Sequence, residues 1–562
     1  MALLLYYGCM SKKVLIGLSW PYANGRLHIG HVASSLPADV LARYHRMAGN
    51  DVSFVTGSDC YGTPILVAAK QEGITPKQLS DKYHKFHAKD FKSLGFTFSL
   101  YSKTTAKHHN DFVRDFHARM YLRDKKFIYE QGAEQLYCES CDKYLPDRYV
   151  EGICPFCKGE SKGDSCDGCG KMIEPEELLE PKCKLCAGKP IPRMTRQLYL
   201  KLATLEDRIR EYFNARKESW ANNAIGLTGR YLNEGLIDRA ITRNIEWGVQ
   251  LPKEESKQAF NFSDAELKQK KIYIWAENVL GYLSVTKEWC ERTGRDWREF
   301  LLDNVKSEKL HYYVHGKDNI PFHAIILPGL LMAGDGEYHL PDQIVSSEYV
   351  TMANDKMSKS KGNIIRAEDL VKTFDVDLIR YFFIRNVNDR KDVNFTLEDF
   401  CATINADLVN SFGNLVNRTL SFIKTKFNGR LVTGKRCSAV EQEIANTYME
   451  VGELIEKGKT NKALHRAMDL VHFANKYFDA CEPWKTVKND VEKCKSDLMD
   501  VINIIANLAR VLYPFVPGAC TKVAKWLKIV ANEWRPIFIE NELKLGKFDV
   551  LFNRLDVKLV QI

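Results

Sequence analysis

The chain has 562 residues, more than one hydrophobic core can serve, so about three to four domains are expected. With 45% hydrophobic and 27% charged residues the composition is typical of a globular protein, and no apolar run reaches the roughly 18 residues of a membrane span. The apolar start MALLLYYGC is too short, and lacks the leading basic region, for a signal peptide. The net charge of +9 is compatible with a polyanionic partner.

The first part of the chain, residues 12–115, reads as α/β units. A strand VLIGL at 14–18 is followed by PYANGRLHIGH and a helix that reaches about Met47, and then by a second apolar run, DVSFVTG, that leads to Asp59. This order predicts a parallel sheet with ligands at the carboxyl ends of its strands. His28 and His31 are three residues apart and share a face of the helix's first turn, where backbone N–H groups suit phosphate. Two solvent-exposed histidines after a βα loop are the alternative interpretation.

A cysteine-rich segment interrupts this pattern between about residues 116 and 229. Eight of the sixteen cysteines form four Cys-x-x-Cys pairs, which in a chain without a secretion signal favour metal and a reducing, cytoplasmic location over disulfides. Four thiolates satisfy one tetrahedral Zn²⁺, so eight predict two structural zinc ions. We expect a nested arrangement, with an inner site of Cys154, Cys157, Cys166 and Cys169 and an outer site of Cys138, Cys141, Cys183 and Cys186. Redox-active or accidental cysteines are the alternative.

The rest of the chain contains a second α/β part, a basic loop and a helical part. KIYIWAENVLGY and LHYYVHGKDNIPFHAIILPGLL resume the α/β pattern over 230–349. The loop NDKMSKSKGN, Asn354 to Asn363, alternates lysine with serine, which suits phosphate oxygens. From about residue 400 to 562, apolar residues recur at helical spacing. The expected domains are therefore 1–115 and 230–349 for the two halves of the α/β part, 116–229 for the insertion, 350–399 for the basic loop region and 400–562 for the helices.

Two of these motifs together resemble the signatures of class I aminoacyl-tRNA synthetases. HIGH occurs letter for letter as residues 28–31, and KMSKS occurs unaltered as residues 356–360. The resemblance implies that His28, Gly30, His31 and Lys359 bind ATP, which Mg²⁺ accompanies, and that His28, His31 and Lys359 are catalytic with help from Lys356. In this family the amino-acid carboxylate attacks the α-phosphorus of ATP, pyrophosphate leaves, and the protein contributes positioning and electrostatics.

Further motifs resemble the methionyl-tRNA synthetase family from about residue 12 to the C-terminus. These are the knuckle insertion, SWPYANG, SDCYGTPI, GKDNIPFH and CEPW. The resemblance implies a Rossmann-like catalytic domain, an inserted zinc-knuckle connective domain, a C-terminal α-helical anticodon-binding bundle, and methionine, ATP and tRNA(Met) as partners. Asp59 would bind the ammonium group, Asp318 the ribose of ATP, and Arg243 would assist catalysis. The residues expected around methionine are Ser19, Trp20, Asp59, Trp275, Asn278, Val279, Tyr282, Phe322 and His323.

The chain departs from this family at the expected amino-acid pocket. After Trp275 the family commonly has a Leu-Asp-Ala-Pro-like stretch, whereas this chain has Ala276 to Val279, with Asn278 where a small apolar residue is usual. Trp20 is bulkier than the leucine often found there, and we expect it to offset this change. Without the motifs, Trp275, Tyr282 and Phe322 would be read as ordinary core aromatics.

The helical part contains the expected tRNA contacts. Asn414 and Arg418 are four residues apart and share a helix face, and Trp484 follows Glu482-Pro483. An arginine, an amide and an exposed indole suit single-stranded bases, and the resemblance implies that these three residues bind the anticodon. The alternatives are a surface charge for Arg418 and a packing residue for Trp484. The chain shows no sign of an appended oligomerisation domain after residue 535, so a monomer is expected.

Three other functions compete with this interpretation. A cysteinyl-specific class I synthetase is similar in size but uses an open zinc site to bind its substrate thiol, whereas four thiolates close a site. A nucleotidylyltransferase shares the His-x-Gly-His fingerprint but is much shorter. A non-catalytic RNA-binding derivative would have no physical reason to keep His28, His31 and Lys359.

Overall fold

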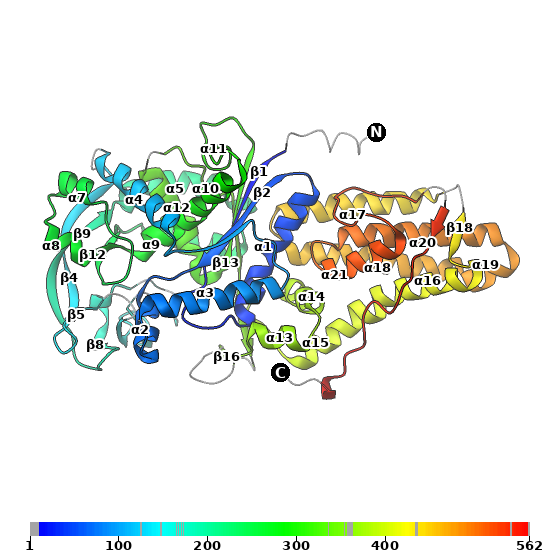
Figure 1. Ribbon diagram of the computed structural model, residues 1–562, viewed down its shortest axis with the longest axis horizontal. Coiled ribbons are helices and arrows are strands. Elements are labelled where there is room, and N and C mark those ends of the chain that lie inside the picture. The colour runs from blue at the N-terminus through cyan, green and yellow to red at the C-terminus, as the bar shows by residue number, and fades with distance from the viewer. Residues whose placement is uncertain are drawn as a thin grey trace.

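The computed structural model is elongated, with the sheet between the cysteine-rich insertion and the helical bundle (Figure 1). It describes residues 11–123, 126–145, 149–163, 166, 168–169, 171, 173–334, 336–352, 355–356, 364–432, 436–539 and 542–559. No helix within these ranges is long and apolar enough to cross a membrane.

A five-stranded parallel sheet organises the α/β part. Its order is β14 (Gln343–Ser347), β13 (Lys309–Gly316), β1 (Lys13–Leu18), β2 (Asp51–Ser58) and β3 (Leu100–Lys103). In the register, Ile16 of β1 lies between Tyr312 of β13 and Phe54 of β2. The chain therefore has the predicted α/β class, and the carboxyl ends of β13, β1 and β2 lie next to one another at one edge.

The two faces of this sheet belong to two different cores, because successive side chains of a strand point in opposite directions. Val14, Ile16 and Leu18 of β1 pack in the core that contains α1 (Ile29–Met47). Leu15 packs on the other side, in the core that contains α4 (Lys107–Leu122), α10 (Gly281–Thr293) and α12 (Leu327–Ala333). α2 (Thr63–Glu72) and α3 (Pro76–Ser93) lie between β2 and β3 in the chain.

The insertion is built around antiparallel strands. The long pair β4 (Ile128–Cys138) and β9 (Ile191–Leu200) is flanked by β5 (Lys143–Tyr144) and β10 (Arg239–Ala240). A smaller sheet carries the knuckles: β7 (Glu160–Lys162), β6 (Val150–Ile153) and β8 (Leu179–Cys183). The expected boundary at residue 115 falls inside α4, which continues to Leu122.

The chain returns to the sheet through short elements. They are α5 (Leu202–Arg216), α6 (Asn222–Glu234), β11 (Thr242–Asn244), α7 (Lys253–Phe260), α8 (Asp264–Gln269), β12 (Lys270–Ile272), α9 (Ile274–Glu277) and α11 (Arg298–Leu301). After β14 come β15 (Val350–Met352), β16 (Asp355–Lys356), α13 (Ala367–Thr373), α14 (Val376–Asn386) and β17 (Val393–Phe395).

The C-terminal part is helical, as the spacing of apolar residues predicted. α15 (Leu397–Ile404), a π-helical segment (Asn405–Gly413) and α16 (Asn414–Phe427) run without interruption, followed by α17 (Ser438–Glu456), α18 (Thr460–Cys481), α19 (Pro483–Asn489), α20 (Val491–Val511) and α21 (Pro517–Leu527). β18 (Arg430–Val432) pairs with β19 (Glu542–Lys544).

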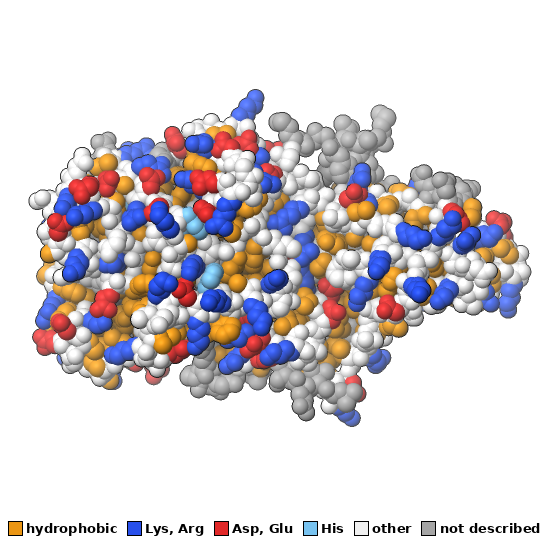
Figure 2. All heavy atoms as spheres, in the orientation of Figure 1, with side chains coloured by type: hydrophobic (Ala, Val, Ile, Leu, Met, Phe, Trp, Pro, Cys, Tyr) orange, Lys and Arg blue, Asp and Glu red, His pale blue; other side chains and the backbone are white. Residues whose placement is uncertain are grey.

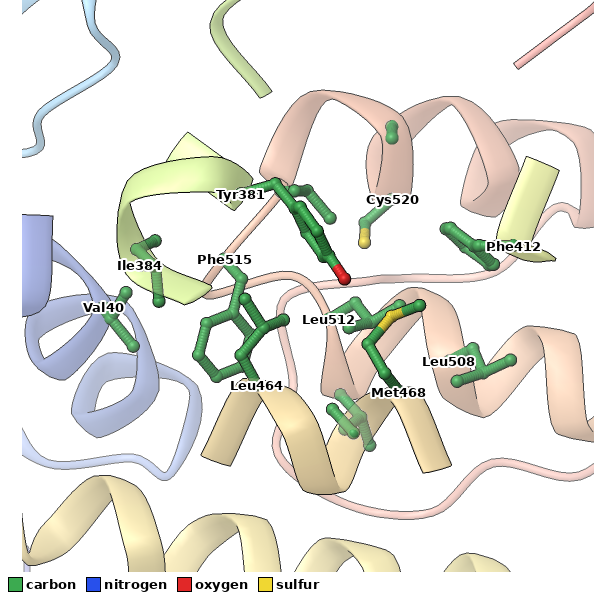
Figure 3. Close-up of a cluster of buried hydrophobic side chains, with 14 of the residues drawn as sticks. Val40, Tyr381, Ile384, Phe412, Leu464, Met468, Leu508, Leu512, Phe515 and Cys520 are labelled. Atoms are coloured by element: carbon green, nitrogen blue, oxygen red, sulfur yellow. The ribbon is translucent and has the colours of Figure 1, made fainter. Parts of the chain in front are cut away.

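The bundle and the sheet share one continuous core. Figure 3 shows Val40 of α1 beside Ile384 of α14 and Phe515, which follows α20. At the same junction the buried Arg380 of α14 pairs with Asp39 of α1 at 2.8 Å and donates to the carbonyl oxygen of Phe515 at 3.0 Å. Burial by itself would raise the pKa of Asp39. The attraction of the guanidinium groups of Arg380 and Arg43 is larger and lowers this pKa to about 2. The helix that begins at the HIGH motif is thus fixed to the bundle by apolar contact and by a buried ion pair.

Candidate active site

The two histidines of the HIGH motif cap α1. The Nδ1 atom of His28 accepts from the N–H of Gly30, and the Nδ1 atom of His31 accepts from the N–H of His28, both at 3.2 Å. The ring centroids lie 3.9 Å apart, and the first turn contains no acidic residue. The positive end of a 19-residue helix and two imidazoles therefore meet at one place, which suits an anionic phosphate group.

Described residues on both sides of the basic loop have contacts, while most of the second signature lies outside the described residues. β16 brings the backbone of Lys356 against β15, while Lys359 lies outside the described residues. Beyond the loop, the carbonyl oxygen of Ile365 accepts from the N–H of Ile29 at 3.1 Å, and the N–H of Ala367 donates to Leu27 at 2.9 Å. The chain that leaves the basic loop is therefore hydrogen-bonded to the start of α1.

Four of the ring-bearing residues expected around methionine lie in two contacting pairs, Tyr282 with His323 and Trp275 with Phe322. The Tyr282 hydroxyl lies 2.8 Å from Nε2 of His323, whose Nδ1 lies 2.9 Å from the carbonyl oxygen of Asn319. The carbonyl only accepts, so Nδ1 carries the proton and Nε2 accepts from the tyrosine. Burial lowers the pKa of His323 to about 4, which keeps this imidazole neutral at pH 7. Trp275 and Phe322 are half-buried neighbours with ring centroids 4.7 Å apart.

Trp20 fills a slot that two glycines leave open. A Cβ atom on Gly57 of β2 would lie 2.5 Å from Cζ3 of Trp20, and one on Gly281 of α10 would lie 2.7 Å from its Cζ2. The indole ring is T-shaped to Tyr282, at 6.3 Å between centroids, and is 93% buried. Trp20 is therefore closely packed between these two glycines, and Val279, another residue expected around methionine, is 98% buried.

Polar candidates stand at the carboxyl ends of the central strands. Ser19 directly follows β1, and its N–H donates to the carbonyl oxygen of Val314 at 2.9 Å. Asp59 directly follows β2 and is 97% buried, while Asp318 follows β13 and is exposed. The amide of Asn278 donates to Oδ2 of Asp59 at 2.8 Å, and the N–H of Tyr61 lies 3.2 Å from its Oδ1.

Arg243 occupies a different environment from the one expected for a helper of ATP. Its guanidinium group donates to Glu174 of the insertion at 2.6 Å and lies over the ring of Tyr273, 4.6 Å from the centroid. The sequence did not point to Glu174, because this ion pair joins residues on either side of β9. In the conformation described, Arg243 connects Glu174 of the insertion to Tyr273.

The eight paired cysteines form the two predicted nested tetrads. Within each tetrad the four Sγ atoms lie within 4.8 Å of one another. The Sγ–Sγ distances are 3.4 Å for Cys138 and Cys186 and 4.0 Å for Cys141 and Cys183 in the outer tetrad, and 3.5 Å for Cys157 and Cys166 in the inner one. A tetrahedral zinc ion with Zn–S bonds of about 2.3 Å requires about 3.8 Å between sulfurs. Both tetrads can therefore hold such an ion.

The three expected anticodon residues lie on neighbouring helices. Asn414 begins α16 and is exposed. Arg418 donates to Asp479 of α18 at 2.7 Å and lies 4.3 Å from the ring centroid of Phe478. Trp484 of α19 is 47% exposed, and its ring lies 6.4 Å from that of Phe478. Phe478, which the sequence analysis missed, thus links Arg418 with Trp484, and Lys and Arg side chains are spread over the bundle surface in Figure 2.

Comparisons with known proteins cover nearly the whole chain. A family model described as tRNA synthetases class I (M) matches residues 14–420, and one described as the anticodon binding domain of methionyl tRNA ligase matches residues 431–552. The chain is 42% identical to a methionine–tRNA ligase of Bacillus cereus (strain 03BB102) and 39% identical to methionine–tRNA ligase 1 of Alkaliphilus oremlandii, with 98% of each chain covered in both cases.

A solved structure shows the same fold. It is that of Mycobacterium tuberculosis methionyl-tRNA synthetase in complex with methionyl-adenylate, with a TM-score of 0.77, 22% sequence identity, and coverage of 97% of this chain and 100% of that one. Together with the two family models and the full-length relatives, the motifs of the α/β part and the helical part lead to one assignment. The chain belongs to the methionyl-tRNA synthetase family of class I aminoacyl-tRNA synthetases.

Proposed function

We propose that this chain is an active methionine–tRNA ligase. It activates methionine with ATP to give methionyl-adenylate and pyrophosphate, and it then transfers the methionyl group to the 3′ end of tRNA(Met). The observation that supports the proposal, in a member of this family, is that His28 and His31 begin the helix after β1 and that Asp59 directly follows the neighbouring strand β2. The hydrogen-bonded pair of Tyr282 and His323 is consistent with it.

The first step needs no protein nucleophile. The methionine carboxylate attacks the α-phosphorus of ATP, an O–P bond forms, and the bond to the pyrophosphate oxygen breaks. His28, His31 and the N–H groups of the first turn of α1 bind the phosphates and stabilise the charge that develops on them. Lys356 and Lys359 are proposed to add positive charge from the basic loop. Mg²⁺, which accompanies ATP, would neutralise charge on the leaving pyrophosphate.

The pocket residues select and orient the amino acid in this proposal. Asp59 binds the ammonium group, and Trp20, Trp275, Tyr282 and Phe322 surround the thioether, since polarizable sulfur packs well against aromatic rings. Asp318 binds the ribose of ATP, and Arg243 assists only if it exchanges Glu174 for substrate.

The second step joins the site to the bundle. The terminal ribose hydroxyl of tRNA attacks the carbonyl carbon of the adenylate, and AMP leaves. Asn414, Arg418 and Trp484 are proposed to bind the anticodon, Trp484 by stacking its exposed indole on a base. The two cysteine tetrads are proposed to hold structural zinc, because four thiolates leave no position for a water. We expect the chain to act as a monomer, which light scattering would test.

ATP–pyrophosphate exchange with the purified protein, measured separately for each of the twenty amino acids, tests the proposal. We expect exchange with methionine alone. Exchange with cysteine would instead establish a cysteinyl enzyme, and no exchange with any amino acid would favour an RNA-binding role. His28→Ala should slow exchange by at least about 100-fold, as expected when a group that stabilises transition-state charge is removed. His472→Ala, which changes an exposed histidine of α18, is the matched control and should leave the rate unchanged.

A further inference from the structure

Asn278 contacts the carboxylate of Asp59. The asparagine begins a short 3-10 turn between α9 and α10. Its Nδ2 atom donates to Oδ2 of Asp59 at 2.8 Å, while Oδ1 of Asp59 faces the N–H of Tyr61 at 3.2 Å. Each oxygen of this carboxylate therefore has a donor held by the protein.

The backbone of Asp59 is fixed independently of this contact. Its N–H donates to the carbonyl oxygen of Pro21 at 2.9 Å, and its own carbonyl oxygen accepts from the N–H of Ala23 at 2.8 Å. These bonds attach the end of β2 to the segment that leads to the HIGH motif. With the backbone fixed, the carboxylate of Asp59 can change its orientation only by rotation about the side-chain bonds. The hydrogen bond from the amide of Asn278 restrains this rotation.

We propose that Asn278 is a positioning residue for methionine, which holds the Asp59 carboxylate in the orientation that receives the substrate ammonium group. This inference rests on the proposed function and deepens it. Asn278 acts through Asp59 and takes no part in the chemical step.

The chemical nature of the asparagine side chain supports this role. Asp59 is 97% buried, and a buried carboxylate oxygen without a hydrogen-bond donor is costly. An apolar residue at 278 would remove the donor that Asn278 gives to Oδ2. A lysine or arginine would supply one, but its charge would compete with the ammonium group for Asp59. A neutral amide satisfies one lone pair and leaves the negative charge for the substrate.

Steady-state exchange kinetics of Asn278→Ala test the inference. Because the lost bond involves an ionised acceptor, we expect the KM for methionine to rise about tenfold or more, with the KM for ATP within about twofold of wild type. Asn278→Asp has nearly the same shape but places a second carboxylate against Asp59, so its KM for methionine should rise further. Circular dichroism would verify that both variants fold.

An analogue without the ammonium group separates positioning from simple packing. The probe is 4-(methylthio)butanoate, used as a competitive inhibitor against methionine. If Asn278 acts through Asp59 and the ammonium group, the Ki of this analogue should be the same for the wild type and for Asn278→Ala. Equal losses for methionine and the analogue would show that Asn278 is merely part of the pocket wall and would overturn the inference, as would an unchanged KM for methionine. In an Asp59→Asn background, Asn278→Ala should add nothing.

Calorimetric binding of methionine keeps this inference distinct from the proposed function. A wild-type protein that binds methionine without exchange, and whose affinity falls in Asn278→Ala, would refute the proposed catalysis and support the positioning role. A wild-type protein that binds no methionine would overturn both.

Discussion

The fit of Trp20 between two glycines predicts a specific mutational rescue. Gly281 has ordinary helical torsions, so Gly281→Ala is acceptable for the backbone, but the new Cβ atom would lie 2.7 Å from Cζ2 of Trp20. Carbon atoms normally approach to about 3.5–4.0 Å, so the indole must move by about 1 Å. Overpacking of this kind costs about 1–3 kcal/mol. If the ring moves toward the residues expected around methionine, bound substrate must displace it again, and up to this amount opposes binding; since about 1.4 kcal/mol is a factor of ten, the KM for methionine should rise by up to about 100-fold.

The assay is methionine-dependent ATP–pyrophosphate exchange, combined with thermal unfolding. Leucine lacks the ring atoms that meet the new methyl group. The double variant Gly281→Ala/Trp20→Leu should therefore have a KM for methionine much closer to the wild-type value than Gly281→Ala has. Gly57→Ala is the matched control, because its Cβ atom would lie 2.5 Å from the backbone oxygen of Ser102 as well as from Trp20. Trp20→Leu should not rescue that variant. A wild-type KM for methionine in Gly281→Ala, or a raised KM that Trp20→Leu does not lower, would refute the close fit of Trp20 against Gly281.

Three further predictions concern metal, tRNA and pH. Metal analysis should find about two zinc ions per chain, and Cys154→Ser should reduce this to about one; a wild-type value of one would contradict the two tetrads. Trp484→Ala should raise the KM for tRNA(Met) at least about tenfold without changing methionine activation, whereas Met449→Ala, at a similarly exposed side chain of α17, should change neither. Burial, assisted by Lys12, lowers the pKa of His45 to about 3, so the unfolded chain takes up this proton first and stability is lost as the pH falls below about 6.5. At pH 5 the wild type should have lost about 2 kcal/mol of unfolding free energy through this group. His45→Gln lacks the group, so its unfolding free energy should fall by about 2 kcal/mol less than that of the wild type between pH 7 and pH 5. Urea titrations that show equal losses for the two proteins would contradict this.

Local signals were sufficient for much of the fold. The strand at 14–18, the helix to Met47 and the helices after residue 400 follow from the period of the apolar residues, which is a property of neighbours in the chain. The nested cysteine tetrads follow from spacing. Each Cys-x-x-Cys turn presents two sulfurs, and the two inner pairs are close enough in the chain to share one metal ion, which leaves the two outer pairs for a second ion. A joint role of the basic loop and His28 was inferred by resemblance, and the described residues add that Ile365 and Ala367, which follow the loop, are hydrogen-bonded to the start of α1.

The sequence by itself determined the family, through the HIGH and KMSKS motifs, and the two cysteine tetrads that could hold metal ions, since these are local patterns that can be read from residue type and spacing. The tertiary structure alone decided which partners the site residues have. Asn278 donates to Asp59, Trp20 lies between Gly57 and Gly281, and Arg418 meets Phe478. The first of these contacts spans 219 residues of chain. Hydrogen bonds and van der Waals contacts act only over a few ångströms, so residues distant in sequence become partners only once the sheet and the helices have packed.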